Sequence, residues 1–317
     1  MGRCPPTTTV TSLEFALTFG GPTILVVALA LGLYAAARAP GRLAVVAGLG
    51  ALALVPVGLF AAGMRYRSPP PATTRTLGPG IDYERVVVEG PAVVHIVRID
   101  LARPDIVPVA TPPSKGRAVP AQRVRDFAIE HDAAVAMNTA FFHPFHSNSP
   151  FDYYPRTGEP TEPFGVTMTD GVEFGANRFH KATVFLSEDR ASLERFDAAR
   201  WAVTGRTVLV REGQPQEANA EAIAPRSAIA HDGDRLWFVV VDGRQPGYSE
   251  GMTLASLAQL LAEQGAKWAV EMDGGGSSTL IDATDRPVRA LNCPIHTRLP
   301  CRERPVAAQV GVRYAPR

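Results

Sequence analysis

Two almost continuously apolar runs, residues 15–34 and 43–64, open the sequence. Each approaches the roughly 20 residues that an apolar helix needs to cross a bilayer. The segment Arg38-Ala-Pro-Gly-Arg42 between them has the basic and helix-breaking residues of a tight turn. We therefore expect residues 1–66 to form a membrane anchor of two transmembrane helices, at about residues 13–37 and 43–64. A cleaved signal peptide followed by a single anchor is the alternative.

Basic residues beside the apolar runs give conflicting indications of orientation. Arg38 and Arg42 favour a cytoplasmic loop, which places the C-terminal part of the chain outside the cell. Arginines that follow the second run argue the other way: Arg65, Arg67 and Arg75. The apolar runs therefore predict a membrane partner, and the orientation depends on further evidence.

Two cysteines supply that evidence. Cys293 and Cys301 lie close together in an irregular, Pro-rich segment that suits a small disulfide loop, and such bridges form in oxidising compartments. Two unrelated thiols are the alternative, because spacing does not fix the geometry. A zinc site is disfavoured, because His296 would supply only a third ligand. We expect a protein of the cell membrane whose C-terminal domain is extracytoplasmic.

The overall charge argues against a nucleic-acid partner. The chain has 32 basic and 31 acidic residues and a formal net charge of +1. It has no long basic run and no recognisable nucleic-acid-binding motif. Nucleic acid is therefore not an expected partner.

The rest of the chain is predicted to be a linker and one folded domain. Residues 67–80 are rich in proline, which predicts a stiff, extended linker, and residues 81–317 form the domain. Apolar periodicity predicts strands at 92–101, 133–137, 236–241 and 268–272, and helices at 120–131 and between Thr253 and Gly265. We predict an α+β fold, a mixed twisted β-sheet with flanking helices, preceded by the N-terminal two-helix transmembrane hairpin.

Polar residues follow three of the predicted strands. Asn138 follows the predicted strand at 133–137, Asp242 and Arg244 follow the strand at 236–241, and Asp273 follows the strand at 268–272. Loops at strand ends are where α/β architectures usually place ligands. An Asp-Gly pair can also be simple turn chemistry, and this is the better interpretation of Asp232-Gly-Asp234, which lies between two strands.

Three consecutive glycines, Gly274 to Gly276, come directly after Asp273. Such a run loses much backbone freedom on folding, so it suits a place where the backbone approaches a ligand closely or offers several N–H groups to an anion. Ser277 and Ser278 add hydroxyl donors. The spacing matches neither a nucleotide phosphate loop, nor a dinucleotide fingerprint, nor a serine-hydrolase elbow. An anion- or sugar-binding turn with a carboxylate at its entrance remains.

Four blocks in the second half of the chain are more specific: Pro225-Arg-Ser-Ala-Ile-Ala230, Val240-Val-Asp-Gly-Arg-Gln-Pro-Gly-Tyr248, Gly251-Met-Thr-Leu254 and Glu271-Met-Asp-Gly-Gly-Gly-Ser-Ser278. Their order and spacing resemble the phosphodiester glycosidase (uncovering-enzyme-like) domain family, over roughly residues 80–315. The resemblance implies removal of a sugar, such as N-acetylglucosamine, that is linked through its anomeric oxygen to a phosphodiester. One block departs, because the family usually has Asn-Gly-Gly-Phe-Phe where this chain has Asn138-Thr-Ala-Phe-Phe142.

This chemistry needs a carboxylate at the oxocarbenium-like centre or at the attacking water, and cationic or N–H contacts to the phosphate. A phosphate ester is already a weakly basic leaving group, so a strong general acid matters less. The candidate catalytic carboxylates are Asp273, Asp242 and Glu271. The candidate substrate-binding residues are Asn138, Arg226, Arg244, Gly274, Gly275, Gly276, Ser277, Ser278 and His143. A turn role for Asp273 and a structural salt bridge for Arg226 or Arg244 are the alternatives.

No metal and no cofactor are expected. His143 and His146 flank Pro144, which prevents a regular helical register, so they are expected to line the cleft instead of holding a metal. The expected partner is a glycan or sugar-phosphate substrate at the cell surface. Two other functions stay open, namely a non-catalytic, membrane-tethered module that binds glycan phosphates and a phosphodiesterase that cleaves at phosphorus.

Overall fold

The computed structural model describes residues 34, 37, 67–114, 116–175, 182–218 and 221–315. Contacts divide the chain into two units, Met1–Arg67 and Ser68–Arg317. The predicted membrane anchor lies almost wholly outside the described residues, and within them no helix is both long enough and apolar enough to cross a membrane. The predicted boundaries of the anchor, linker and domain stay predictions.

The largest sheet of the second unit has eight strands. In spatial order they are β1 (Thr73–Gly78), β2 (Ile81–Val88), β3 (Ala92–Asp100), β19 (Arg235–Val241), β18 (Arg226–His231), β20 (Trp268–Met272), β16 (Val208–Arg211) and β17 (Gln214–Pro215). The predicted strands at 92–101, 236–241 and 268–272 correspond to β3, β19 and β20. The turn at Asp232-Gly-Asp234 joins β18 to β19, as expected for a hairpin.

Strands β3 and β19 are buried on both faces, because successive side chains of a strand point to opposite sides of the sheet. In β19, Phe238 and Val240 enter one apolar cluster, whereas Trp237 and Val239 enter another. The first cluster also contains side chains from a second, five-stranded sheet. The second cluster contains the buried face of helix α5 (Leu254–Glu263). The eight-stranded sheet is therefore covered by a helix on one face and by another sheet on the other.

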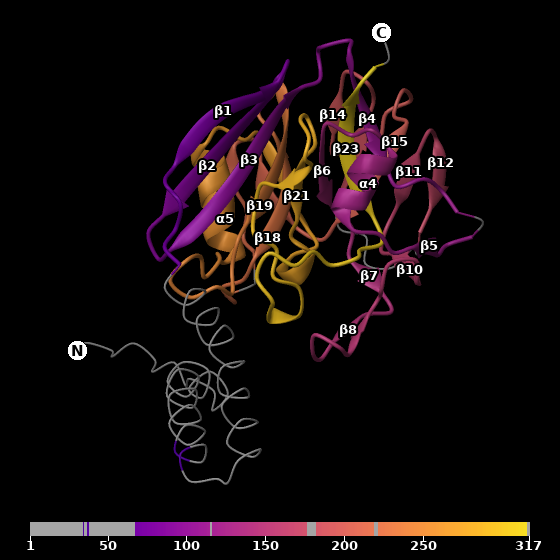
Figure 1. The fold of residues 1–317 in the computed structure, drawn as a ribbon. Coiled ribbons are helices and arrows are strands. Elements are labelled where there is room, and N and C mark those ends of the chain that lie inside the picture. The colour runs from indigo at the N-terminus through magenta and orange to yellow at the C-terminus, as the bar shows by residue number, and fades with distance from the viewer. Residues whose placement is uncertain are drawn as a thin grey trace. The chain divides into compact units, whose positions relative to one another are not determined.

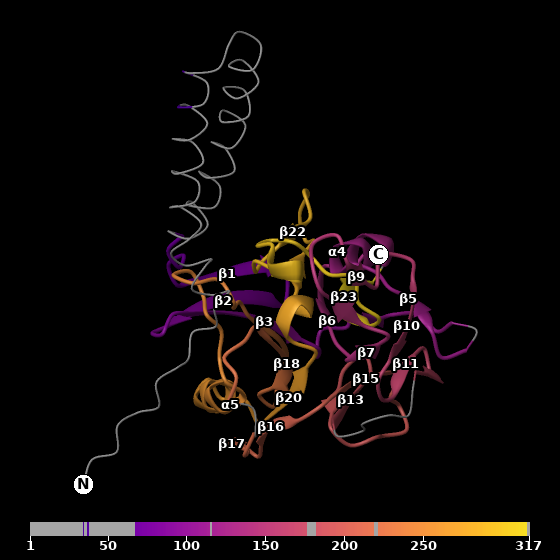
Figure 2. The ribbon, with the colours of Figure 1, turned by 90° about the horizontal axis from the view of Figure 1, so that it is seen from below.

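The second sheet has five strands, in the order β22 (Arg289–Ala290), β21 (Leu280–Asp282), β6 (Val135–Asn138), β23 (Gln309–Tyr314) and β4 (Ile106–Ala110). Helix α4 (Val124–Glu130) packs Phe127 and Ala128 into a cluster with residues of β6 and β21. In Figure 1, α4 lies beside β6 and β23, whereas α5 lies against the eight-stranded sheet. Figure 2 likewise shows the two helices well apart, with strands between them.

The remaining strands are short. They are β12 (Val172–Phe174), β11 (Thr167–Thr169), β15 (Trp201–Gly205), β13 (Ala182–Leu186) and β14 (Ala191–Ser192) in one sheet, β5 (Val119–Pro120), β10 (Pro160–Pro163) and β7 (Phe142–His143) in another, and β8 (His146–Ser147) with β9 (Tyr153–Tyr154) in a third. Two 3-10 turns, η2 (Gly275–Ser277) and η3 (His296–Arg298), complete the set.

The predicted fold class is wrong. The described residues are mostly β-sheet with only two α-helices, and neither could cross a membrane. Every pairing between named strands is antiparallel, so the sheets are not mixed. The two helix–strand units seen in the sequence do exist, but many strands of only a few residues carry no readable periodicity. The two helix–strand units therefore predicted a larger fraction of helix than the structure has.

Candidate active site

The candidate residues meet at one end of the large sheet. Strand β18 runs antiparallel to both β19 and β20, so its first residue, Arg226, lies at the edge where the other two strands end. Asp242 and Asp273 are the residues that follow those ends. Asn138 ends β6 in the other sheet, and its Nδ2 donates a 2.6 Å hydrogen bond to the backbone oxygen of Asp273. The site therefore lies where the ends of two sheets come together.

The glycine turn is fixed by backbone contacts. The N–H of Gly275 donates to the carbonyl oxygen of Pro225 at 2.9 Å, and the φ angle of Gly275 is +64°, which glycine adopts readily. A Cβ on Gly274 would lie 2.9 Å from the same carbonyl oxygen. The close approach of Pro225 therefore favours glycine at position 274, and the positive φ angle favours glycine at position 275.

Two arginines lie over the turn. A Cβ on Gly275 would lie 3.2 Å from Nη1 of Arg244, and a Cβ on Gly276 would lie 2.4 Å from Nη2 of Arg304. Arg304 also donates from Nη1 to Ser277 Oγ at 3.0 Å. Within the part of the chain that the structure describes, neither arginine forms an ion pair. Two guanidinium groups against a glycine backbone can bind an oxyanion.

Burial and neighbouring positive charges lower the pKa of both arginines. Burial is the main cause that lowers the pKa of Arg304 to about 10, and the charge of Arg244 adds to this effect. Burial and the charge of Arg298 lower the pKa of Arg244. Asp273 opposes both shifts. Like charges are therefore concentrated around one carboxylate, an arrangement that an anionic ligand would stabilise.

Asp273 is the carboxylate beside these arginines. Protein atoms surround the carboxyl group of Asp273, while part of the residue as a whole is accessible to solvent. Burial raises the pKa of this carboxyl group to about 6. The charge of Arg304 and a hydrogen bond with Ser277 lower this pKa, whereas the charge of Glu271 raises it. Asp273 can therefore change its protonation state near neutral pH, as acid–base residues commonly do.

Glu271 and Arg226 form a buried pair behind this carboxylate. Glu271 receives two hydrogen bonds from Arg206, from Nη2 at 2.7 Å and from Nε at 3.1 Å. Arg226 Nη1 lies 3.7 Å from Glu271 Oε1, and Arg226 Nε donates to the backbone oxygen of Met252 at 2.9 Å. These contacts already use the side chains of Glu271 and Arg226 inside the protein.

Asp242 has only 1% of its surface exposed. Its carboxylate accepts hydrogen bonds from His95 Nε2, Tyr248 Oη, Asn292 Nδ2 and the N–H of Cys293, at 2.9–3.0 Å. Burial alone would raise its pKa, but the contacts with His95, Tyr248 and Asn292 outweigh burial and lower it. Asp242 is thus close to Asp273 in the sheet but faces the interior, where it anchors the start of the Cys293 loop.

That loop is closed by the predicted disulfide between Cys293 and Cys301, which is confirmed, with a Cα–Cα distance of 4.3 Å. The loop carries His296, which is 1% exposed and whose Nδ1 accepts a 3.2 Å hydrogen bond from Arg304 Nε. Burial, with the charges of Arg304 and Arg302, lowers the pKa of His296 to about 3, so the ring is neutral. The disulfide loop therefore positions Arg304.

No sequence pattern pointed to Arg304, and His296 stood out only as a possible zinc ligand. Neither residue lies in one of the four family blocks, and an arginine among arginines has no distinctive sequence signal. The predicted disulfide was the one available indication, because it closes the loop that carries His296 and ends three residues before Arg304. Arg206, which holds Glu271, was missed for the same reason.

Several other predicted residues support the turn from inside. Asn138 is fully buried, and its Oδ1 accepts hydrogen bonds from Ser227 Oγ and from the N–H of Thr279. Ser277 and Ser278 are also buried. The predicted residue His143 has other neighbours: its Nε2 lies 3.2 Å from Oε2 of Glu162, and its ring is near the ring of Phe164.

The residues that replace the family's glycines are buried as well. Thr139 and Ala140 are at most 1% exposed, so their side chains do not line the surface of the site. The backbone oxygen of Thr139 accepts a 2.8 Å hydrogen bond from the N–H of Asp273. The departure from the family pattern thus changes the packing behind the turn and leaves the backbone contact in place.

A family model described as phosphodiester glycosidase matches residues 131–313, which is more than half of the chain. The chain belongs to this family. The resemblance inferred from the four sequence blocks is therefore confirmed, and membership supports hydrolysis of phosphodiester-linked sugars as the general activity. No curated protein matches the sequence significantly.

Two solved structures share the fold of this family member. A hypothetical protein from Synechocystis aligns with a TM-score of 0.59 at 15% identity, over 77% of this chain and 64% of that protein. The chain thus spans less than two thirds of the length of that protein. The catalytic domain of zebrafish N-acetylglucosamine-1-phosphodiester alpha-N-acetylglucosaminidase, auto-inhibited by its pro-peptide, aligns with a TM-score of 0.54 at 18% identity, over 80% of this chain and 92% of that domain.

Proposed function

We propose that this protein hydrolyses the glycosidic bond of a sugar linked through its anomeric oxygen to a phosphodiester. Asp273 is the proposed catalytic residue, and Arg244 and Arg304 bind the phosphate. The observation that carries the proposal is the pair of arginines without a carboxylate partner, held against Gly275 and Gly276 beside a carboxyl group of raised pKa.

The arginines account for the leaving group. A phosphodiester carries one negative charge, and the charge on the leaving oxygen grows as the carbon–oxygen bond breaks. Guanidinium groups stabilise that charge through charge-assisted hydrogen bonds. Arg304 is held by His296 and Ser277, so little reorganisation is needed when the substrate binds.

Asp273 accounts for the anomeric carbon. Above its pKa of about 6 the carboxylate is ionised and can stabilise positive charge on the sugar or accept a proton from water. In the hydrolysis, the bond between C1 and the phosphate oxygen breaks and the phosphate monoester leaves with the electron pair. The oxygen of water bonds to C1, and its proton passes to Asp273 and then to solvent.

The test is a panel of sugar-1-phosphodiesters, starting with p-nitrophenyl and UDP-linked N-acetylglucosamine. We expect turnover by the unaltered protein and a loss of at least about a hundredfold in kcat for Asp273→Asn. In 18O-labelled water the label should enter the sugar, because the carbon–oxygen bond breaks. Turnover that survives Asp273→Asn would overturn the assignment of this residue.

Other outcomes identify the remaining functions. Label in the phosphate would mean cleavage at phosphorus. Binding of the panel without any product, unchanged by Asp273→Asn, would mean a glycan-phosphate binding module. Glu271→Gln and Asp242→Asn belong in the same assay, because their predicted catalytic roles compete with the positioning roles that their contacts suggest.

The domain is further proposed to work outside the cytoplasm, at the cell surface. The disulfide between Cys293 and Cys301 supports this location, since such bridges persist in oxidising compartments. Thiol labelling of intact cells tests it: the two cysteines should be unreactive before reduction and reactive afterwards with a membrane-impermeant reagent.

A further inference from the structure

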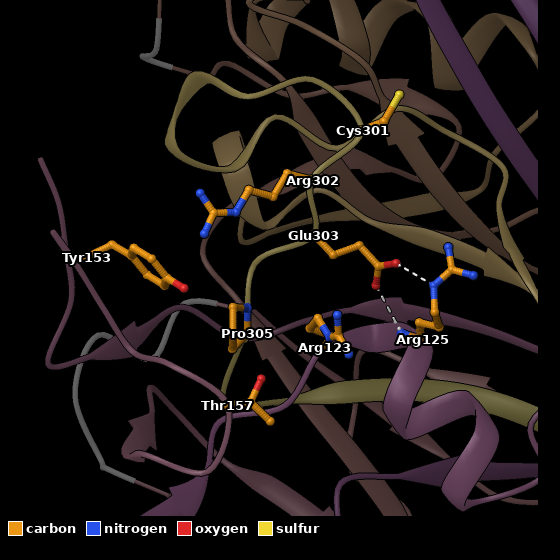
Figure 3. A pocket seen from close by; sticks show the side chains of 8 residues that line it. All are labelled: Arg123, Arg125, Tyr153, Thr157, Cys301, Arg302, Glu303 and Pro305. Atoms are coloured by element: carbon orange, nitrogen blue, oxygen red, sulfur yellow. Dashed lines mark hydrogen bonds and ion pairs between the residues drawn. The ribbon is translucent and has the colours of Figure 1, made fainter. Parts of the chain in front are cut away.

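A cavity of about 460 Å³ borders the disulfide loop, because Cys301 is among the residues that line it. Tyr153, Thr157, Arg302 and Pro305 are among the residues that line it. Figure 3 shows the guanidinium of Arg302 extending toward Tyr153, while Glu303 turns the other way to pair with Arg125. The cavity thus has one wall of Arg302 and Tyr153.

The charges of this cavity are unbalanced. Arg125 is paired with Glu303 at 2.9 Å, and Arg123, also in the wall, is paired with Asp126 at 2.7 Å. Arg302 forms no ion pair within the described part of the chain. One positive charge of the wall is therefore left for a ligand.

Arg302 is also held in place. Its guanidinium carbon lies 4.9 Å from the ring centroid of Tyr153. Its Nη1 donates to the backbone oxygen of Pro150 at 3.2 Å and to Thr297 Oγ1 at 2.8 Å. These hydrogen bonds use Nη1, so the edge formed by Nε and Nη2 can bind an oxyanion with two parallel hydrogen bonds.

His296 connects this cavity to the glycine turn. The ring of Tyr153 meets the ring of His296 edge-on at 4.7 Å, and His296 Nδ1 accepts from Arg304. The proton of the neutral ring is then on Nε2, which is buried and has no hydrogen-bond partner among the described residues. A buried donor without an acceptor is costly unless a ligand or water satisfies it. Side-chain contacts thus run from Arg304 through His296 and Tyr153 to Arg302.

We propose that the cavity at Arg302 and Tyr153 binds a second oxyanion, carried by the leaving group of the substrate. The inference rests on the proposed function. It assigns the substrate class as sugar phosphodiesters whose leaving group bears a further phosphate, either the adjacent phosphate of a nucleoside diphosphate or the next phosphate of a repeating phosphoglycan.

The experiment compares three substrates that contain the same sugar. A methyl phosphodiester has one charge, a UDP-sugar has an adjacent second phosphate, and a synthetic two-repeat phosphoglycan has a more distant one. We expect Arg302→Gln to raise KM about tenfold for the substrates that use the second site, with kcat and the methyl substrate little changed. Whichever of the two larger substrates responds identifies the source of the second phosphate.

Two variants serve as comparisons. Arg156 carries the other guanidinium near Tyr153, 5.5 Å from the ring centroid. Arg156 is exposed and is not among the residues that line the cavity. Arg156→Gln should therefore leave all three KM values unchanged. Arg302→Lys keeps the charge and should restore part of the affinity. An equal change of KM for all three substrates, or no change, would overturn the second site.

Binding measurements separate this inference from the proposed function. Calorimetry with pyrophosphate and with the two-repeat phosphoglycan should show weaker binding of at least one of them to Arg302→Gln than to the unaltered protein, while binding of the methyl phosphodiester should be equal. If the substrates are not turned over, the proposed function fails and this measurement still decides the second site. If Arg302→Gln changes the affinity for neither pyrophosphate nor the two-repeat phosphoglycan, the second site is rejected.

Discussion

Arg304 occupies the space that a side chain at Gly276 would need, because a Cβ at that position would lie 2.4 Å from its Nη2 atom. The same guanidinium donates to Ser277 and lowers the pKa of Asp273. A side chain at position 276 would therefore displace the guanidinium group of Arg304 from its present position. The turn and Arg304 act as one unit.

Gly276→Ala should accordingly resemble the loss of Arg304. We expect kcat/KM to fall by about a hundredfold in Gly276→Ala and in Arg304→Ala alike, because both remove a positioned cation from the leaving group. The double variant should be little worse than either single variant, since contacting residues are not additive. Independent, multiplying losses in this double-mutant cycle would show that the two positions act separately.

Asp273→Asn should stabilise the protein at neutral and alkaline pH. Burial raises the pKa of Asp273 to about 6 from 3.8, so between these values the folded state holds a proton that the unfolded state has lost. The free energy of unfolding therefore falls as pH rises through this window. The amide of Asn does not ionise, so the Asp273→Asn variant does not lose this part of the free energy of unfolding. We expect its Tm to exceed that of the unaltered protein by a few degrees, on the order of 2–4 °C, at pH 8, with the difference closing toward pH 4. A lower Tm at every pH would contradict this.

Asp242→Asn should act mainly on stability. Asp242 accepts four hydrogen bonds in the interior, and removing its charge leaves buried donors such as His95 poorly satisfied. We expect a loss of about 3 kcal/mol in the free energy of unfolding, measured with urea. Asp234→Asn, in an exposed hairpin, is the matched control and should change little. A stable but inactive Asp242→Asn would instead favour a catalytic role for Asp242.

Cys301→Ser should reduce stability and activity, because it opens the disulfide loop that holds His296 beside Arg304. The disulfide closes the loop that holds His296, and through it Arg304. We expect the variant to lose about 2 kcal/mol of stability and to have reduced activity. Dithiothreitol should produce the same decrease in Tm in the unaltered protein and no change in the variant. An unaltered protein whose Tm and activity resist complete reduction would contradict this role of the loop.

The sequence predicted those parts of the site that are local in the chain. Strand β20, Asp273 and the glycine turn follow one another directly in the chain, and they lie within the region that the family model matches. Helix α5 was predictable from the Thr253 cap and the leucine spacing, because both signals lie within the helix itself. The cysteine pair was predictable because its segment is short and irregular.

The rest depends on tertiary contacts. The carboxylate of Asp242 faces inward because it accepts hydrogen bonds from His95, Tyr248 and Asn292. These three residues come from separate parts of the chain. Arg304 belongs to the site only because the disulfide loop places it over Gly276. Antiparallel pairing throughout could not be inferred either, since strands of two or three residues have no usable alternation.

The bond from Asn138 to the backbone oxygen of Asp273 has a kinetic consequence. It joins the last residue of a strand in one sheet to the loop that leaves a strand in the other. Each sheet could acquire its own strand pairing during refolding without making this bond. Recovered activity should therefore report the final docking of the two sheets, and it should lag behind any optical signal of β-structure.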